Sequence, residues 1–231
     1  MEIEKGVLYV VGTPIGCLDD LTVRALFVLK GVDCIACEDT RTASKLLNRY
    51  EVKVPLIAYH EHNELMQVSP LIEKLRSGES IALISDAGIP TISDPGFRII
   101  RECRKQMIDV IPIPGASAVM TALSVSGLPT DCFSFFGFLP PKASARKTFF
   151  ERHRNDQETL VLYESCHRIE KFLNDLIAVL GEERTIFIGR EMTKMHETYL
   201  AGSVKDVRER LLSRSKKGEF VVLIAKEDFA L

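Results

Sequence analysis

Short apolar runs alternate with amphipathic segments over the first half of the chain. The apolar runs are rich in β-branched residues and predict strands at 7–11, 34–37, 56–59, 81–85 and 109–113. Segments with helical spacing lie between them, near 20–30, 41–49, 63–77 and 96–106. Such alternation predicts a mainly parallel sheet with helices on both faces.

The second half repeats this alternation after a segment with a different pattern. Residues 112–131 read PIPGASAVMTALSVSGLPTD, a small-residue helix between Pro-Gly and Gly-Leu-Pro signals. Strands are then predicted at 133–138, 159–164, 185–189, 197–202 and 219–225, with helices near 142–153, 167–180 and 203–214. We therefore expect a two-domain α/β fold, with domains 1–113 and 114–231, each a mixed, mainly parallel sheet flanked by helices, and a hinge at about 112–131.

The composition indicates a globular protein of a reducing compartment. The 231 residues are 46% hydrophobic, enough for a sizeable core. The N-terminal MEIEKGVLYVV fits no signal or transit peptide, and no window approaches the roughly 20 apolar residues of a membrane span. Cys34 and Cys37 form a CxxC, but a strand points them to opposite faces, so we expect two buried thiols and no zinc. We expect a cytoplasmic location.

The charge of the chain does not by itself indicate a nucleic-acid-binding protein. The formal net charge is −2. Two local clusters, KASARKTFFERHR at 142–154 and RERLLSRSKK at 208–217, each carry five Lys or Arg against one Glu. Clusters of this kind are usually solvated helix faces, so they are compatible with RNA binding without establishing it.

The polar motifs follow the predicted strands, where ligands collect in open α/β sheets. The first strand is followed by GTPIGCLDDLT, in which Gly12 and Gly16 allow close backbone approach and Asp19 is placed to cap the next helix. The second strand is followed by EDTR, the fourth by the Asp86 loop, SDAGIPTISDPG, and the fifth by PGAS. We expect these loops to form the functional site.

Three alternatives for this site fit the sequence less well. A Rossmann dinucleotide site would use Glu38, but Gly12-Thr-Pro-Ile-Gly16 lacks the GxGxxG spacing, and its proline removes an N–H. No Walker A loop is present. His60 and His62 could face one metal, but no third ligand is marked, so we expect no metal.

The remaining loops are rich in glycine, carboxylates and carbonyls and poor in cations. Such a pocket suits a ligand that is cationic and carries hydroxyl groups. S-adenosylmethionine has a sulfonium and a ribose, and its adenine needs an apolar slot. Asp-x-Gly and Asp-Pro-Gly are also common turn sequences, so the pattern alone is only suggestive.

Eight motifs along the chain closely resemble the RsmI-type members of the tetrapyrrole methylase superfamily, which are small-subunit rRNA methyltransferases. In order, they are LYVVGTPIGCLDDLTVRAL, EDTRTASKLL, YHEHNE, ALISDAGIPTISDPG, PIPGASAVMTALSVSGLPTD, FFGFLP, YESCHR and GREMTKMHET. The resemblance covers nearly the whole chain. It departs from the family pattern at Cys17, Ile89 and Cys166, where members usually have Asn, Thr and Pro.

The resemblance implies S-adenosylmethionine bound in a cleft between the two domains and usually a homodimer. It implies methylation of the ribose 2′-oxygen of a cytidine in the decoding region of small-subunit rRNA. The expected partner is this rRNA within the ribosomal subunit. Many relatives extend past the last strand, whereas this chain stops at Leu231. We expect any RNA contacts of that extension to be absent or replaced.

The resemblance and the positions beyond strand ends together suggest three groups of site residues. The candidates for catalysis, as general base or polarising group, are Glu61, His60, Lys194 and Glu197. The candidates for cofactor binding are Asp86, Ala87, Gly88, Ser117, Ala118, Tyr163 and Glu164. The candidates for substrate binding are Arg24, Glu38, Asp39 and Arg41, with Glu38 and Asp39 also possible bases.

Two further functions stay open at this point. One is methylation of a tetrapyrrole or another small molecule, as in other branches of the superfamily, although EDTR, YHEHNE and TKMHET match the RNA branch. The other is a non-catalytic ribosome-binding protein that has kept the fold. Cofactor binding without turnover would favour the second.

Overall fold

The protein consists of two compact units. The structure, a computed structural model, describes residues 2–231, and the chain divides between Ser117 and Ala118. This division falls inside the segment 112–131 expected to be a hinge. The assignment of functional domains to 1–113 and 114–231 stays a prediction, and each unit is described below by itself.

The first unit is an open parallel sheet with helices on both faces. Its strands are β1 (Leu8–Val11), β2 (Cys34–Cys37), β3 (Leu56–Ala58), β4 (Ile81–Ile84) and β5 (Val110–Ile113). They lie in the order β3-β2-β4-β1-β5, and every pairing is parallel. The helices are α1 (Val23–Gly31), α2 (Thr40–Arg49), α3 (Glu64–Arg76) and α4 (Phe97–Lys105), with a short 3₁₀ turn at Leu18–Asp20. The elements agree closely with those predicted from the apolar pattern.

Two hydrophobic clusters cover opposite faces of this sheet. One cluster includes α1 and α2 side chains such as Val28 and Leu47, and the other includes α3 and α4 side chains such as Leu75 and Ile99. Cys37 belongs to the first cluster and Cys34 to the second. The prediction that these two thiols are buried and point apart is therefore confirmed.

Helix α1 shows a small difference from the predicted cap. Thr22, not Asp19, is the N-cap, and its hydroxyl oxygen accepts a hydrogen bond from the Ala25 N–H at 3.0 Å. Asp19 lies one turn earlier, in the 3₁₀ segment, and pairs with Arg49 at 3.6 Å. The cap differs because α1 begins at Val23, three residues after the start near residue 20 that the apolar spacing indicated.

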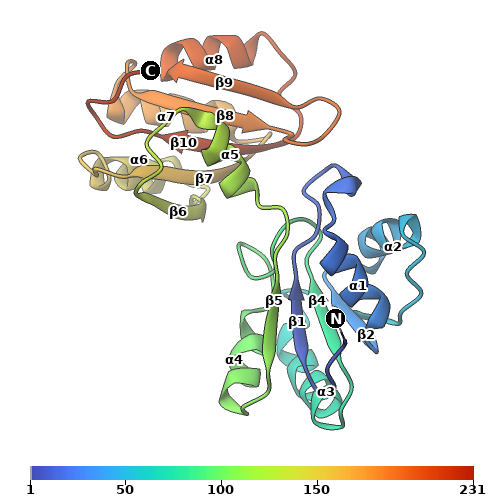
Figure 1. Ribbon diagram of the computed structural model, residues 1–231. Coiled ribbons are helices and arrows are strands. Elements are labelled where there is room, and N and C mark those ends of the chain that lie inside the picture. Colours follow the sequence, from blue (N-terminus) through green and yellow to red (C-terminus); the bar gives the residue numbers. More distant parts are fainter. Residues whose placement is uncertain (1) are drawn as a thin grey trace. The chain divides into compact units, whose positions relative to one another are not determined.

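The second unit begins with α5 (Ala118–Ser126) and contains a mixed sheet. Its strands are β6 (Phe133–Phe138), β7 (Thr159–Ser165), β8 (Thr185–Arg190), β9 (Thr198–Ser203) and β10 (Glu219–Ile224). Its other helices are α6 (Ala143–Arg152), α7 (Ile169–Leu180) and α8 (Val204–Leu212). Figure 1 shows α5 against the sheet, where it contacts β10 and β8.

The pairing in this sheet is mostly antiparallel, whereas every pairing in the first unit is parallel. The strand order is β6-β7-β10-β8-β9, and only β6 and β7 pair in parallel. The connection from β8 to β9 contains no helix, so it reverses the chain direction, and β10 then enters between β7 and β8. Alternation along the sequence does not reveal which strands become neighbours.

One arginine of the basic segment 142–154 is buried in the core of the second unit. Phe150, Phe172 and Leu176 pack with alternate residues of β7, β8 and β10. Arg146 is buried beside them, where its guanidinium donates to the Asp175 carboxylate at 2.6 and 3.0 Å. This arginine of segment 142–154 therefore has a structural role and does not face solvent or RNA.

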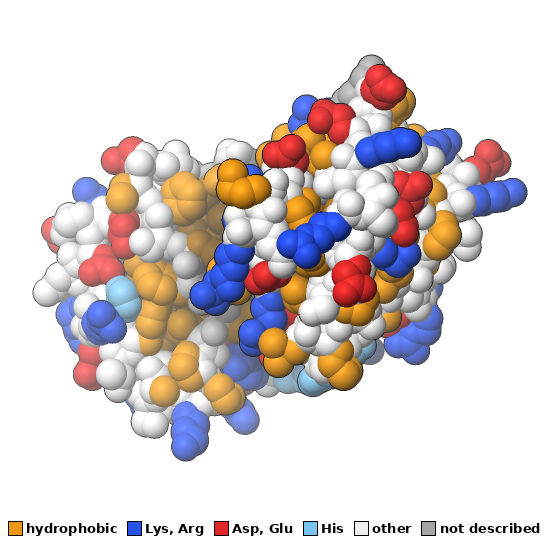
Figure 2. Space-filling view, turned by 90° about the horizontal axis from the view of Figure 1, so that it is seen from below, with side chains coloured by type: hydrophobic (Ala, Val, Ile, Leu, Met, Phe, Trp, Pro, Cys, Tyr) orange, Lys and Arg blue, Asp and Glu red, His pale blue; other side chains and the backbone are white. Residues whose placement is uncertain are grey.

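The exposed surface carries mixed charge. In Figure 2, Lys and Arg side chains lie among Asp and Glu side chains, with hydrophobic patches between them. In the second basic cluster, Arg208 donates to the Asn174 side chain at 2.7 Å, and Lys216 pairs with Glu170 at 2.8 Å. Within residues 2–231, no helix is both long and apolar enough to cross a membrane.

Candidate active site

The carboxyl ends of all five strands of the first sheet meet at one edge, because the strands are parallel. At this edge the loops after β1 and β5 touch backbone to backbone. The Gly12 N–H donates to the Ile113 carbonyl at 3.0 Å, and a Cβ on Gly12 would lie 2.7 Å from the Gly115 Cα. The close approach expected at Gly12 is thus an approach to the neighbouring loop of the same unit.

The loop after β1 also holds the Asp86 loop after β4. The Thr13 N–H donates to the Gly88 carbonyl at 2.8 Å, and the Gly88 N–H donates back to the Thr13 carbonyl at 3.1 Å. Gly88 has φ +81°, a conformation that favours glycine. Asp86 and Ala87 are thereby presented at the sheet edge with exposed side chains.

Three carboxylates from the loops after β2 and β4 gather at this edge. The Asp39 backbone N–H donates to Asp86 Oδ1 at 3.1 Å. Partial burial, and then the charge of Asp39, raise the pKa of Asp86. Partial burial, and then the charge of Asp86, raise the pKa of Glu38. Among the three, Glu38 and Asp86 therefore hold a proton more tightly than ordinary carboxyl groups.

Asp39 is engaged locally, together with Arg41. Its carboxylate caps α2 by accepting from the Arg41 N–H at 2.8 Å, and it binds the Arg41 guanidinium at 2.6 Å. These hydrogen bonds from Arg41 hold the pKa of Asp39 well below its usual range. A pair this exposed contributes little stability, so the Arg41 side chain can rearrange around a ligand. Arg24 lies exposed near the start of α1.

His60 lies after β3 at the same edge. Its Nδ1 is buried without a hydrogen-bond partner among residues 2–231. His60 acts to lower the pKa of Glu38, against the larger effect of burial. Its backbone N–H donates to the Asn63 Oδ1 at 2.8 Å, which fixes the turn into α3. Glu61 is exposed. The ring centroids of His60 and His62 are 6.0 Å apart, and no group of three or more possible metal ligands occurs among the described residues.

Glu64 is a residue of this edge that the sequence reasoning missed. Its Oε1 accepts from the Tyr59 hydroxyl at 3.0 Å and from the Gly96 and Arg98 N–H groups, both at 3.3 Å. Glu64 thus ties the end of β3 to the end of the Asp86 loop, in which Thr91 and Ser93 have positive φ. The signal was present, because Glu64 ends the motif YHEHNE.

In the second unit, Tyr163 and Glu164 lie near the end of β7. The Tyr163 ring contacts Phe135 and Phe138, with centroids 4.9 and 5.6 Å away. Glu164 is buried, and its Oε1 accepts from the Ser165 N–H at 2.7 Å and from Arg168 Nε at 2.8 Å. Its Oε2 is buried with no hydrogen-bond partner in the described part of the chain. An unsatisfied buried carboxylate oxygen calls for a donor, which a ligand or water can supply.

Lys194 and Glu197 lie on the connection from β8 to β9. Lys194 donates to Glu219 at 2.8 Å and to Glu191 at 2.9 Å. Burial alone would lower the pKa of Lys194, but these hydrogen bonds outweigh it and raise the pKa. Lys194 therefore stays a cation. Glu197 accepts from the Thr193 N–H at 2.9 Å and the Tyr199 hydroxyl at 2.8 Å.

The structure thus brings the candidates together in two groups. Glu38, Asp39, His60 and Asp86 share the carboxyl edge of the first sheet, and each strand that carries them is a neighbour of another. In the second sheet, Glu164, Phe220 and Arg190 are in register on β7, β10 and β8. Tyr163 and Glu164 therefore lie at the same sheet edge as the Lys194 loop. Ser117 ends the first unit and Ala118 begins the second.

Most of the chain matches a known protein family. Residues 7–208 match the model of the Tetrapyrrole (Corrin/Porphyrin) Methylases. Among solved structures, diphthine synthase has a TM-score of 0.73 at 14% identity and covers 95% of this chain and 90% of its own. Uroporphyrin-III-C-methyltransferase from Thermus thermophilus has a TM-score of 0.67 at 20% identity and covers 96% and 95%. At these identities the structures show the fold alone.

Sequence relatives are much closer. The chain is 51% identical over 221 residues to ribosomal RNA small subunit methyltransferase I of Haemophilus influenzae, covering 95% of this chain and 78% of that protein. It is 44% identical to the protein of the same name from Escherichia coli O157:H7, covering 95% and 78%. The chain belongs to the tetrapyrrole methylase family and, within it, to the ribosomal RNA small subunit methyltransferase I group.

Proposed function

We propose that this enzyme transfers a methyl group from S-adenosylmethionine to the ribose 2′-oxygen of a cytidine in small-subunit (16S) rRNA. The observation that carries the proposal is the identity of 42–51% to proteins named ribosomal RNA small subunit methyltransferase I, over 94–96% of this chain. The relatives share their name across many bacteria. The resemblance of the motifs EDTR, YHEHNE and TKMHET to the RNA branch supports the same substrate.

The residues at the two sheet edges fit the proposed cofactor. Bound S-adenosylmethionine supplies a methyl group on an electrophilic sulfonium. In the first unit, Asp86, Ala87, Gly88 and Ser117 offer a carboxylate, carbonyls and small side chains. In the second, the unsatisfied Glu164 Oε2 offers an acceptor for the exocyclic amino group or a hydroxyl. Tyr163 and Ala118 offer an aromatic ring and backbone groups.

A general base is the main demand that the reaction places on this chain. The leaving thioether is neutral, so no leaving group has to be protonated, whereas the ribose hydroxyl is a very weak acid. Glu38 and His60 are the best candidates, because the pKa of Glu38 is raised toward the working pH and His60 carries an unpartnered ring nitrogen. Of the two roles expected for Glu38, substrate binding and general base, the proposal favours the second. The exposed Glu61 lacks such an environment.

The remaining candidates have supporting roles in this proposal. Lys194 is a fixed cation and Glu197 shapes its loop, so neither is suited to take a proton. Arg41 and Arg24 are exposed cations near the edge of the first sheet and are suited to phosphate groups of the substrate. Asp39 orients Arg41 and, through its N–H, also Asp86.

The test is to map the position of the transferred methyl group. The protein is incubated with S-adenosylmethionine labelled in the methyl group and with unmethylated small ribosomal subunits, free rRNA or a tetrapyrrole precursor. We expect the label on the ribose of one cytidine. Label on a base would overturn the reaction, and label on the tetrapyrrole alone would overturn the substrate.

We also propose that the enzyme works as a homodimer in the cytoplasm, where its ribosomal substrate is found. Light scattering of the purified protein at micromolar concentration tests the first part, and a monomer would refute it.

A further inference from the structure

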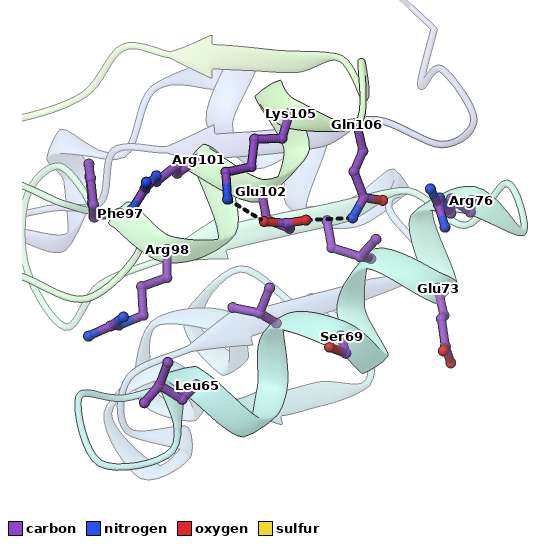
Figure 3. A pocket seen from close by; sticks show the side chains of 12 residues that line it. Leu65, Ser69, Glu73, Arg76, Phe97, Arg98, Arg101, Glu102, Lys105 and Gln106 are labelled. Carbon is purple, nitrogen blue, oxygen red and sulfur yellow. Dashed lines mark hydrogen bonds and ion pairs between the residues drawn. The ribbon is translucent and has the colours of Figure 1, made fainter.

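A groove separates α3 and α4 on the surface of the first unit. Its volume is about 510 Å³. Figure 3 shows its lining side chains rising from both helices. The lining residues are Leu65, Val68, Ser69, Ile72, Glu73, Arg76, Phe97, Arg98, Arg101, Glu102, Lys105 and Gln106. Among them only Arg98, which binds Glu64, contacts a residue described at the candidate active site.

The groove carries more positive than negative charge. Its four cations outnumber its two carboxylates, Glu73 and Glu102. Lys105 is paired with Glu102 at 3.4 Å, and Arg98 is paired with Glu64 at 3.2 Å. Arg76 and Arg101 are exposed and make no hydrogen bond or ion pair to any residue of 2–231. A protein with a net charge of −2 thus keeps two uncompensated guanidinium groups in one concave surface.

The cations of α4 are spaced to follow a chain of phosphates. Arg98, Arg101 and Lys105 are three and four residues apart, so they lie along one side of the helix. The helical rise of 1.5 Å per residue spreads them over about 10 Å. The phosphates of one nucleic-acid strand recur about every 3.4 Å along the helix axis, so about three phosphates span this row.

The groove also offers contacts for bases and riboses. At its start, Phe97 and Leu65 are 65% and 71% exposed, and an exposed aromatic ring can stack on a base. Near its end, the buried Oε1 of Gln106 has no hydrogen-bond partner within the described chain and can accept from a hydroxyl. The amide nitrogen of Gln106 is already bonded to Glu102 at 2.7 Å.

The position of the groove connects it with the candidate active site. Helices α3 and α4 begin at the carboxyl edge of the sheet, directly after His60 and the Asp86 loop, and run back along the strands. An RNA strand whose ribose reaches Glu38 at this edge can therefore continue between the two helices.

We propose that the α3–α4 groove binds the phosphodiester backbone of the RNA substrate beside the target nucleotide. This inference rests on the proposed function, because it assigns the partner of that reaction to a surface. A second copy of the chain fits less well, since a two-fold axis that crosses the groove would bring Arg76 and Arg101 close to the same cations of the other copy.

The experiment removes the two unpaired charges and compares a matched control. The variant Arg76→Gln/Arg101→Gln is compared with Lys30→Gln/Lys45→Gln, which loses the same charge from exposed positions of α1 and α2 on the other face of the sheet. Binding of a fluorescein-labelled single-stranded RNA is measured by anisotropy at several salt concentrations. Methylation of unmethylated small subunits, titration with S-adenosylmethionine and light scattering are measured in parallel.

We expect the RNA affinity of the groove variant to fall roughly 10- to 30-fold near 0.1 M salt. The plot of the logarithm of the RNA association constant against the logarithm of the salt concentration should become less steep by about 1.4. The KM for subunits should rise while kcat and cofactor affinity stay unchanged, and Arg76→Lys/Arg101→Lys should restore most of the affinity. The control double variant should behave like the wild type.

Three results would overturn the inference. They are unchanged RNA affinity of the groove variant, an equal loss in the control, and dissociation of a dimer in the groove variant, which would assign the groove to a second copy. Failure of the wild type to label subunits would instead refute the proposed function, and the affinity comparison would still decide on the groove.

Discussion

Replacing Glu38 by Gln tests the proposed general base most directly. The substitution keeps the shape of the side chain and one carbonyl oxygen but removes the group that can take a proton. General-base catalysis contributes about 10²–10⁴-fold, or about 3–5 kcal/mol of activation free energy. We therefore expect kcat to fall by about this factor, with the affinity for S-adenosylmethionine within about threefold of the wild type.

The same substitution is expected to stabilise the protein at neutral pH. Burial, and then the charge of Asp86, raise the pKa of Glu38 above the ordinary value of 4.5. The folded chain therefore binds this proton more tightly than the unfolded chain, so folding stability falls as the pH rises through the window between the two pKa values. Gln removes this cost, so Tm of the variant should exceed that of the wild type at pH 7 and equal it near pH 3.

The assay is single-turnover methylation of small subunits between pH 5 and 9, with thermal unfolding on the same samples. The methylation rate of the wild type should rise with pH until Glu38 is ionised. The rate of the variant should not show this rise. His60→Gln and Glu61→Gln serve as comparisons, and we expect a smaller loss for the exposed Glu61. A kcat within tenfold of the wild type, or a Tm lowered at pH 7, would refute the reasoning.

Three further predictions concern the packing around the two sheet edges. Gly12→Ala should lower stability by about 1–3 kcal/mol in thermal unfolding and weaken cofactor binding, because its Cβ would lie 2.7 Å from the Gly115 Cα; an unchanged Tm would contradict this. Asp175→Ala should cost about 3–5 kcal/mol in denaturant unfolding, since it leaves the buried Arg146 unpaired, and an additional Arg146→Met change should recover part of the loss. Glu164→Gln should weaken binding of S-adenosylmethionine by about 10- to 100-fold in calorimetric titration, the range for losing a hydrogen bond to a charged group, and unchanged affinity would remove Glu164 from the cofactor site.

Several features of the site could be foreseen from local sequence. Strands such as Cys34–Cys37 and Phe133–Phe138 were predicted with their observed bounds, because short apolar runs bounded by turn residues are a local signal. The position of Asp86 and Glu38 beyond strand ends followed from the alternation of strands and helices. The burial of Cys34 and Cys37 on opposite faces of the sheet could be foreseen because side chains alternate between the two faces along a strand.

Other features depend on residues that are far apart in the chain. Arg146 and Asp175 are 29 residues apart, so the cluster 142–154 was indistinguishable from a solvated basic face. Glu64 reaches Gly96 across 32 residues. The roles of these residues depend on partners that are distant in sequence, so a local sequence pattern cannot predict them.

The sequence by itself determined the order of strands and helices, the faces that turn inward and the edge where the functional loops end. Apolar periodicity and turn chemistry act over a few residues, which is why they can be read along the chain. Only the tertiary structure decided that β10 enters between β7 and β8, that Asp86 lies close enough to Glu38 to raise its pKa, and that α3 and α4 leave a cationic groove. Strand neighbours, burial and pKa shifts arise from contacts between distant segments, and these contacts exist only once the chain has folded.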